Sequence, residues 1–266
     1  MNTEWTISDG RYVDTHSHYD DKMFDADRDE VLEKLYDRGV GAVITVGCAV
    51  NESRAAMEIA KKHRSVYFAS GLHPELVSNA PDNWYDEIKA MAMADKAVAV
   101  GEIGLDYHFE GYDKDLQLEC FEKQLKLAKE LDLPVIVHSR DAAEDTLILL
   151  KKYAPVKGVM HCFSGSAETA AEVLKTGMHI SFTGVLTFKN SRRAIEALNI
   201  IPLDRLLLET DCPYMAPEPY RGTRCDSGMI HSVINRIAAQ KGVSCAEVVR
   251  QTNENVRRLF NIDTDF

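Results

Sequence analysis

Eight short apolar runs recur along the chain, and their spacing constrains the fold more than any other feature. They are rich in Val, Ile, Leu and Ala, and most are near-continuously apolar rather than alternating apolar and polar. Such runs are typical of parallel strands that are buried on both faces of a sheet. The eight predicted strands span residues 11–16, 42–47, 66–71, 97–102, 134–138, 157–163, 178–183 and 205–210.

Helical patterns fill the segments between and after these strands. In residues 113–131, Leu118, Phe121, Leu125 and Ala128 repeat at helical spacing, which places them on one apolar face. The other predicted helices span about residues 26–38, 51–63, 83–94, 141–153, 167–176, 190–199, 228–241 and 245–259.

Strand and helix alternate eight times, which predicts an all-parallel sheet with right-handed crossovers. Eight such units close naturally into an α/β fold of the TIM type, a (β/α)8 barrel. The 266 residues suit such a barrel, which typically needs about 250. We therefore predict one barrel domain over residues 1–266. A doubly wound open sheet is the alternative that the same alternation allows.

Net charge and cysteine content limit the partners and the compartment. The formal net charge of −11 disfavours a protein that coats nucleic acid through bulk electrostatics, although it permits a local basic rim around a site. The six cysteines form no CxxC pair, which favours reduced thiols and a cytoplasmic protein. Since neither a signal peptide nor an apolar run of about 18 residues is visible, we expect no membrane partner. We also expect a monomer.

A pair of histidines lies where the first predicted strand ends. The sequence there is Asp14-Thr15-His16-Ser17-His18, and residues two apart on a strand point to the same side. His16 and His18 would therefore both reach one metal ion. By itself the pair is also compatible with two loop histidines.

Four further candidate ligands end other strands. In a (β/α)8 barrel the carboxyl ends of all strands meet on one face, where catalytic groups lie. Taken singly, each residue has an ordinary alternative as a loop acid, a core histidine or a turn residue. Taken together, they predict a metal site on that face. The four are Glu102 after AVAVG, His138 after PVIV, His161 after GVM and Asp211 after LLLET.

Four imidazoles and two carboxylates exceed what one catalytic metal needs, since such sites usually use three protein ligands and a water. Two divalent ions roughly 3.5–4 Å apart would use all six, with a bridging carboxylate, for which Glu102 is the candidate. Mixed nitrogen and oxygen ligands suit Zn²⁺, Mn²⁺, Fe²⁺ or Co²⁺, and suit Mg²⁺ less well.

Several segments, in this order, resemble the TatD family of metal-dependent hydrolases within the amidohydrolase superfamily. The resemblance implies a TIM-type barrel, a divalent-metal site usually supported by Mg²⁺, and phosphodiester hydrolysis of DNA or RNA. Many members look like 3′→5′ exonucleases that act on single strands. The matching segments are VDTHSHYDD (13–21), GLHPE (71–75), GEIGLDYH (101–108), PVIVHSRDA (134–142), HCFSGS (161–166), LLLETDCPYMAPEPYRG (206–222) and TNENVRRLF (252–260).

The resemblance also assigns roles to individual residues. It places His73, in GLHP, near the scissile phosphate, so that His73 joins Glu102 and Asp211 as a candidate catalytic residue. The metal ligands that it implies are the six already reached from the strand ends, namely His16, His18, Glu102, His138, His161 and Asp211.

One segment departs from the family pattern. After PYRG the family usually continues with a basic residue and Arg-Asn-Glu-Pro, whereas this chain has Thr223-Arg224-Cys225-Asp226-Ser227. Arg224 is kept and the next three residues differ. The departure bears on substrate preference and leaves the metal ligands untouched.

Our mechanistic hypothesis is attack by a metal-activated water that Asp211 orients or deprotonates. Basic residues on strand-end loops would bind substrate phosphates, although a solvated surface charge is the usual role of such residues. Loop aromatics would stack unpaired bases where they do not pack in the core. The cations are Arg140, Lys189, Arg221 and Arg224, and the aromatics are Phe109, Tyr112, Phe163 and Phe188.

Two other functions are compatible with the same residues. A metal-activated water also attacks carbonyl carbon, so the site would equally serve an ester or amide hydrolase such as an aminoacyl-tRNA deacylase. A non-catalytic metal-binding scaffold is the second alternative, and the presence of all six ligands argues against it.

Overall fold

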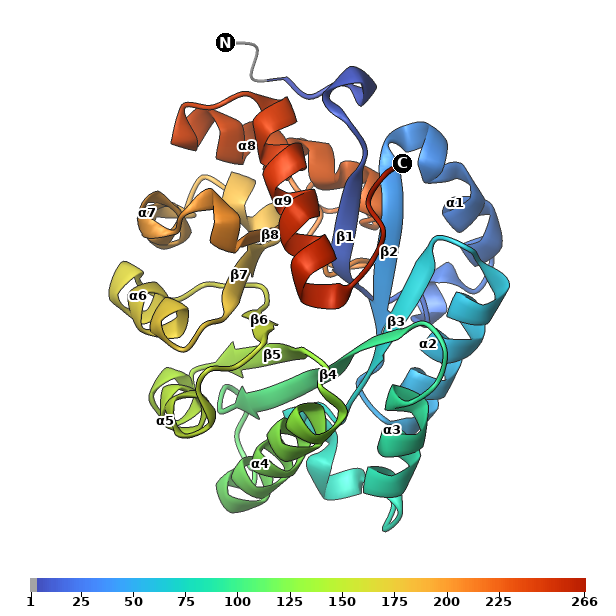
Figure 1. Ribbon diagram of the computed structural model, residues 1–266, viewed down its shortest axis with the longest axis vertical. Coiled ribbons are helices and arrows are strands. Elements are labelled where there is room, and N and C mark those ends of the chain that lie inside the picture. Colours follow the sequence, from blue (N-terminus) through green and yellow to red (C-terminus); the bar gives the residue numbers. More distant parts are fainter. Residues whose placement is uncertain (1–3) are drawn as a thin grey trace.

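The computed structural model describes residues 4–266 and is a TIM-type (β/α)8 barrel (Figure 1). All eight strands are parallel and lie in one sheet in chain order, which confirms the predicted barrel and excludes the doubly wound order. The domain prediction of 1–266 stays a prediction, and residues 1–3 lie outside the described part. The strands are β1 (Tyr12–Ser17), β2 (Val40–Val46), β3 (Val66–Ser70), β4 (Ala97–Asp106), β5 (Val135–Arg140), β6 (Gly158–Met160), β7 (His179–Phe182) and β8 (Leu206–Leu208).

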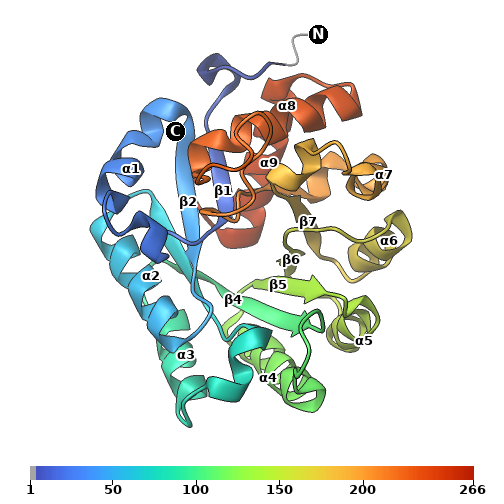
Figure 2. The same ribbon diagram turned by 180° about the vertical axis from the view of Figure 1, so that it is seen from behind.

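Helices α1 to α8 surround the sheet on its outer side, and α9 lies across one end of the barrel (Figures 1 and 2). Within residues 4–266, none of them is long and apolar enough to cross a membrane. The helices are α1 (Arg28–Lys34), α2 (Val50–Lys62), α3 (Trp84–Ala92), α4 (Lys114–Leu131), α5 (Ala143–Tyr153), α6 (Ala167–Lys175), α7 (Arg192–Ile200), α8 (Ile230–Lys241) and α9 (Cys245–Phe260).

The first and last strands close the barrel through hydrogen bonds at their carboxyl ends. Thr15 Oγ1 donates to the carbonyl of Leu208 at 3.0 Å. Beyond β8, the Asp211 amide donates to the His16 carbonyl at 2.9 Å, and the His18 amide donates to the Cys212 carbonyl at 2.7 Å. The residues that follow β8 are therefore fixed beside the end of β1.

Side chains of the strands divide into an outer and an inner set. On β5, Val135 and Val137 pack in the large cluster that the strands share with the surrounding helices. Ile136 belongs instead to a smaller cluster formed by strand residues and the C-terminal segment, which fills the barrel interior. Since side chains alternate along a strand, His138 follows Ile136 on the inner side.

Helix α9 closes the end of the barrel opposite to the strand carboxyl ends. Ser244 caps it, since its Oγ accepts a hydrogen bond from the Glu247 amide at 3.1 Å. Val256 and Phe260 are buried in the inner cluster. Asn255 donates to the carbonyls of Leu203 and Leu206 at 2.8 and 2.7 Å, which ties α9 to the start of β8.

The bounds of several predicted elements differ from the observed ones, and β6 and β8 are each only three residues long. Two further differences have a clear physical reason. Strand β4 runs to Asp106 rather than ending at 102, because its pairing with β5 continues through Asp106 and Arg140. The predicted helix 26–38 is the shorter helix α1, followed by a 3-10 turn at Tyr36–Arg38. Gly39, with φ of 90°, ends that turn and lets the chain enter β2.

Candidate metal centre

Shifts in strand register bring the first ligands to the barrel interior. The β1–β2 ladder shifts between Asp14 and Ser17, and the β3-to-β5 region shifts where the β4–β5 ladder passes from Val100 to Ile103. Such irregularities change the face to which the following side chains point. After the second shift, Ile103 packs outward against the helices while Glu102 faces the other ligands.

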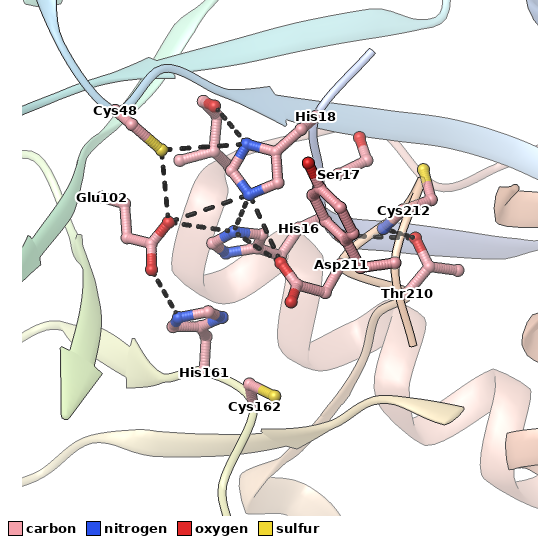
Figure 3. Close-up of polar contacts among 12 residues, drawn as sticks. His16, Ser17, His18, Cys48, Glu102, His161, Cys162, Thr210, Asp211 and Cys212 are labelled. Carbon is pink, nitrogen blue, oxygen red and sulfur yellow. Dashed lines mark hydrogen bonds and ion pairs between the residues drawn. The ribbon is translucent and has the colours of Figure 1, made fainter. Parts of the chain in front are cut away.

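Glu102 lies at the centre of the ligand cluster, and its carboxylate is almost fully buried (Figure 3). Its Oε2 faces one group of ligands. His16 Nε2 is 3.4 Å and His18 Nε2 is 3.8 Å from this oxygen. Asp211 Oδ1 completes the group at 3.3 Å from His18 Nε2 and 3.6 Å from His16 Nε2.

The second oxygen of Glu102, Oε1, faces a separate group of imidazoles. His161 Nε2 is 2.7 Å, His138 Nδ1 is 3.0 Å and His73 Nε2 is 3.4 Å from it. The two oxygens of one carboxylate are thus shared between two sets of nitrogen ligands. The structure brings all six predicted ligands together, and it brings His73 with them.

Hydrogen bonds on the far side of the rings determine which nitrogens face the centre. His18 Nδ1 donates to the Val46 carbonyl at 2.9 Å, which leaves the Nε2 lone pair directed at the cluster. His138 Nε2 donates to Asp106 Oδ2 at 2.9 Å, which leaves its Nδ1 lone pair facing Glu102. A ring that is oriented by a carboxylate or a carbonyl in this way is typical of a metal ligand.

His73 carries the opposite arrangement. Its Nδ1 accepts a hydrogen bond from the Glu75 amide at 3.3 Å, so the ring proton is on Nε2. Nε2–H therefore points at Glu102 as a donor rather than as a lone pair. In this tautomer His73 is suited to donate a hydrogen bond to substrate and is not suited to bind a metal.

The donor set fits divalent cations. In the neutral rings the lone pairs of His18 and His138 face carboxylate oxygens of Glu102, an arrangement that a proton or a metal cation between them stabilises. Ligand atoms of His16, His18 and Glu102 lie within 4.8 Å of one another, as do those of His73, Glu102 and His138. Imidazole and carboxylate ligands suit Zn²⁺, Mn²⁺ or Fe²⁺, and Mg²⁺ less well.

Electrostatics keep the two carboxylates of the centre anionic. Burial alone would raise the pKa of Glu102, but the histidines around it, His161 and His73 foremost, bring that pKa well below its ordinary value. Burial likewise opposes ionisation of Asp211, yet its hydrogen bond with His18 leaves the pKa below the ordinary value. Both carboxylates therefore present negative charge to a cation.

Three residues at the centre were missed by the sequence analysis. Asp106 orients His138, as described, and was hidden because the predicted strand ended too early. Glu209 is fully buried, and it accepts hydrogen bonds from the Cys162 amide at 2.5 Å and from Ser181 Oγ at 2.7 Å. Burial raises the pKa of Glu209 to about 7.

Glu209 is the acidic residue two positions before Asp211, so a strand-end search that kept both acids would have found it. Its ligand atom lies within 4.8 Å of those of His16 and His161. The Nδ1 atoms of these two rings are buried and have no hydrogen-bond partner within residues 4–266. Cys48, the third missed residue, donates its thiol to Glu102 Oε2 at 3.6 Å, and no sequence pattern marked it.

The segment that departs from the family pattern supports the back of β1. Ser227 Oγ donates to Asp14 Oδ2 at 2.6 Å, as does Thr210 Oγ1 at the same distance. Asp226 pairs with Arg38 at 2.7 Å. Burial raises the pKa of Asp14 to about 7. Of the three residues that differ, Ser227 therefore contacts the strand that carries the histidine pair, whereas Asp226 contacts Arg38 just before β2.

The four predicted substrate cations lie around the barrel mouth, and within residues 4–266 no hydrogen bond or ion pair joins them to the ligands. Arg140 ends β5, with its guanidinium 5.2 Å from the ring centroid of Phe109. Arg221 lies 4.4 Å from the ring centroid of Phe188. Lys189, beside that ring, is exposed.

Arg224 is engaged elsewhere. Both of its terminal nitrogens bond Asp27 at 2.7 Å, and one also donates to the Met23 carbonyl. This pair joins the loop after β8 to the loop after β1. The guanidinium keeps 30% of its side-chain surface exposed. Its role in binding substrate stays a prediction.

The predicted stacking residues fall into two kinds. Phe163 packs in the core. Phe109 and Tyr112 are exposed on the loop between β4 and α4, and Phe188 is partly exposed beneath Arg221. Three of the four aromatics are therefore available at the mouth of the barrel.

Comparisons with known proteins find a matching family and several relatives. The family described as TatD related DNase matches residues 13–261, nearly the whole chain. The uncharacterised metal-dependent hydrolase YabD of Bacillus subtilis is 40% identical over 252 residues, which cover 94% of this chain and 99% of that protein. The 3′-5′ ssDNA/RNA exonuclease TatD of Erwinia tasmaniensis is 32% identical and covers 90% of this chain and 96% of its own length.

A solved structure has the same fold. The crystal structure of YJJV, a TatD homologue from Escherichia coli, superposes with a TM-score of 0.90 at 30% identity. The match covers 96% of this chain and all of that one.

Proposed function

Because this chain belongs to the family of TatD-related DNases, which are metal-dependent hydrolases, we propose that it removes nucleotides from the 3′ end of single-stranded DNA or RNA by phosphodiester hydrolysis. A relative at 32% identity is named as a 3′-5′ ssDNA/RNA exonuclease, and this supports the proposal. We place the protein in the cytoplasm as a monomer, in keeping with six free cysteines within residues 4–266.

One observation carries the chemical part of the proposal. The two oxygens of Glu102 face separate groups of nitrogen ligands, with His161 at 2.7 Å from Oε1 and His16 at 3.4 Å from Oε2. A carboxylate that is shared in this way is what a centre of two neighbouring divalent ions requires. His16, His18, Glu102 and Asp211 would hold one ion, and Glu102, His138 and His161 would hold the other.

Divalent ions bound there would polarise a phosphoryl oxygen and lower the pKa of a water at the centre toward neutrality. Asp211 is placed to take the proton of the attacking water on Oδ2, since its Oδ1 already faces His16 and His18. Water attacks phosphorus, the bond between phosphorus and the leaving oxygen breaks, and that oxygen takes a proton from solvent while Asp211 returns its proton to solvent. His73 donates Nε2–H to a phosphoryl oxygen and so stabilises its developing charge.

The loops at the mouth provide the contacts for a strand. We propose that Arg140, Arg221 and Lys189 bind backbone phosphates, which position a substrate without reading its sequence. Exposed rings beside the two arginines favour unpaired bases over a duplex. The resemblance to the family favours Mg²⁺, whereas the imidazole and carboxylate ligands present favour Mn²⁺ or Zn²⁺.

The proposal is tested with metal-stripped protein and 5′-labelled single-stranded DNA, with and without added Mg²⁺, Mn²⁺ or Zn²⁺. We expect a metal-dependent ladder that shortens from the 3′ end. Glu102→Gln keeps the shape of the side chain and removes the shared charge, so it should abolish the ladder. Glu254→Gln makes the same change on the exposed face of α9 and should leave activity unchanged.

Absence of cleavage with every metal would overturn the exonuclease proposal. In that case an aminoacyl ester, assayed beside the DNA, tests the carbonyl hydrolase that the same centre would support. Equal cleavage by the wild type and by Glu102→Gln would overturn the assignment of the centre.

A further inference from the structure

A pocket of about 290 Å³ opens directly beside the metal centre. It lies between the 3-10 helix Pro74–Asn79 and the loop that joins β4 to α4. Asp106, at one edge, bonds His138, and Pro74, at the other, follows His73 in the chain. The pocket is therefore connected to the centre through these two residues, although none of the predicted ligands lines it. The lining includes Pro74, Asn79, Asp106, Phe109, Tyr112 and Gln117.

One wall of the pocket is aromatic. Phe109 leaves 56% of its surface exposed, with Arg140 at 5.2 Å from the ring centroid on the barrel side. Tyr112 is 43% exposed and stacks on Tyr107 with ring centroids 4.7 Å apart and planes 11° from parallel. Exposed rings that are supported in this way offer flat surfaces on which a nucleobase stacks.

The loop that carries these rings is anchored by a buried amide. Gln117 Oε1 accepts from the Asp106 amide at 2.9 Å, and its Nε2 donates to the Asp106 carbonyl at the same distance. Asp113 caps α4 by accepting from the Leu116 amide at 3.0 Å. The wall is thus held in place on one side by the strand and on the other by the helix.

The charge of the lining limits what the pocket accepts. Glu75, Glu110 and Asp113 line it together with Asp106, so four acidic residues surround it, although the carboxylate of Asp106 is itself engaged by His138 and by the His108 amide. Like charges placed together are strongly unfavourable, which disfavours a phosphate group there. A neutral nucleoside with amino and hydroxyl groups would find hydrogen-bond acceptors instead.

We propose that this pocket binds the terminal nucleoside of the substrate strand and requires a free 3′-hydroxyl. The proposal rests on the exonuclease function proposed above and adds the group that is recognised at the strand end. Sites for small molecules usually begin at about 300 Å³, so the volume suits one nucleoside rather than an oligonucleotide. The base stacks on Phe109, and the acidic rim excludes a terminal phosphate.

The test uses three 5′-labelled single strands with metal-loaded protein. One ends in a normal nucleotide, one ends in an abasic nucleotide, and one ends in a normal nucleotide with a 3′-phosphate. The rate of removal of the terminal nucleotide is measured for each. We expect wild-type protein to act at least about tenfold faster on the normal end than on either altered end.

Variants then separate stacking from general damage. Phe109→Ala should slow the normal end by about 5- to 150-fold, the range of base–aromatic stacking, and should leave the abasic end unchanged. Phe109→Trp should restore the wild-type rate. Tyr36→Ala is the matched control, because Tyr36 is a 47%-exposed ring beneath Arg11 near the start of β2.

The claim that the acidic rim excludes a terminal phosphate is tested by a double variant, Glu110→Gln with Asp113→Asn. The new Asn can still cap α4. This double variant should lower the ratio of the removal rate on a 3′-hydroxyl end to the removal rate on a 3′-phosphate end. An unchanged preference, or a Phe109→Ala effect that is equal on normal and abasic ends, would overturn the proposal and leave the exonuclease function standing. If wild-type protein cleaves no strand with any metal, both proposals fail.

Discussion

The two ends of the barrel interior use the same strands for opposite purposes. On β5, β6 and β8, the inner residues Ile136, Val159 and Leu207 form an apolar layer that α9 closes. Two positions further along each strand, the inner side chains are His138, His161 and Glu209. A single step of the strand period therefore separates a hydrophobic core from a ligand cluster.

This difference teaches that stability and function are built in adjacent layers. The apolar layer stabilises the fold by removing side chains from water. The layer above it buries carboxylates and imidazoles, which is costly unless they are paired or bind metals. Glu102 and His16 are buried almost completely, so the upper layer depends on its partners while the lower layer does not.

The largest effect is expected from a substitution that disrupts only the layer of predicted metal ligands, the upper layer. Glu102→Gln should lower activity by about 1,000-fold or more, because both groups of ligands lose their shared charge. At a metal concentration of 100 times Kd, wild-type protein should gain about 2.7 kcal/mol of unfolding free energy, and the variant should gain none. Denaturant melts with and without metal measure this, and an equal gain in both proteins would contradict it.

The second prediction disrupts only the apolar layer that α9 closes, the lower layer. Phe260→Ala removes a buried ring from the closed end of the barrel and should cost about 3–5 kcal/mol of unfolding free energy. Metal content and activity per folded molecule should stay at wild-type values, since the ring lies far from the ligands. A loss of metal in protein that remains folded would show that the layers are not independent.

His179 is a titratable group at the apolar end of the barrel, so the contribution of that end to stability should depend on pH. Burial, with help from the charge of Arg205, lowers the pKa of His179 from 6.5 to about 4. Between these values the unfolded chain binds a proton at His179 and the folded chain does not, so stability falls as pH falls through this window. Above pH 6.5 the group contributes no such dependence.

The shift corresponds to about 3 kcal/mol once pH reaches 4. His179→Gln should therefore lose less stability than the wild type between pH 6.5 and 4, by about that amount. The measurement is the unfolding free energy across the window. Parallel curves for the two proteins would contradict the prediction.

The smallest effect is expected from a residue that acts through a ligand. Asp106→Asn weakens the hydrogen bond that orients His138 and should lower metal affinity by about 10- to 100-fold. Competition with a chelating dye measures the affinity. Asp145→Asn is the control, since it removes a partly buried carboxylate that bonds Tyr107 and Lys114 without touching a ligand. Equal metal affinities of the two variants would show that Asp106 does not orient His138 for metal binding.

The fold, and the gathering of the six predicted ligands at one face of the barrel, could be predicted from the sequence because each depends on local pattern. Continuous apolar runs mark the strands, and the parallel barrel brings their carboxyl ends together whatever the details of packing. His138 and His161 follow their strands in simple alternation, so the pattern was sufficient for them. The register shifts before His16 and Glu102 left no sequence signal, yet strand-end position still located both.

The remaining features depend on partners that are distant in the chain. Arg224 finds Asp27 across the closure of the barrel, and Arg140 finds Phe109 across a strand pair. No local spacing reports such contacts. Asp106 was missed for a different reason, because the end of β4 is set by its pairing with β5 rather than by its own composition.

The closure between β1 and β8 has a consequence for the order of synthesis. The histidine pair is among the first residues made, whereas Asp211 and the Cys212 carbonyl that accepts from His18 come late. A nascent chain that still lacks β8 therefore carries two imidazoles without their carboxylate and without the strand that fixes them. The centre is therefore complete only after β8 and the residues that follow it have been synthesised, so the metal site that we propose assembles late in translation.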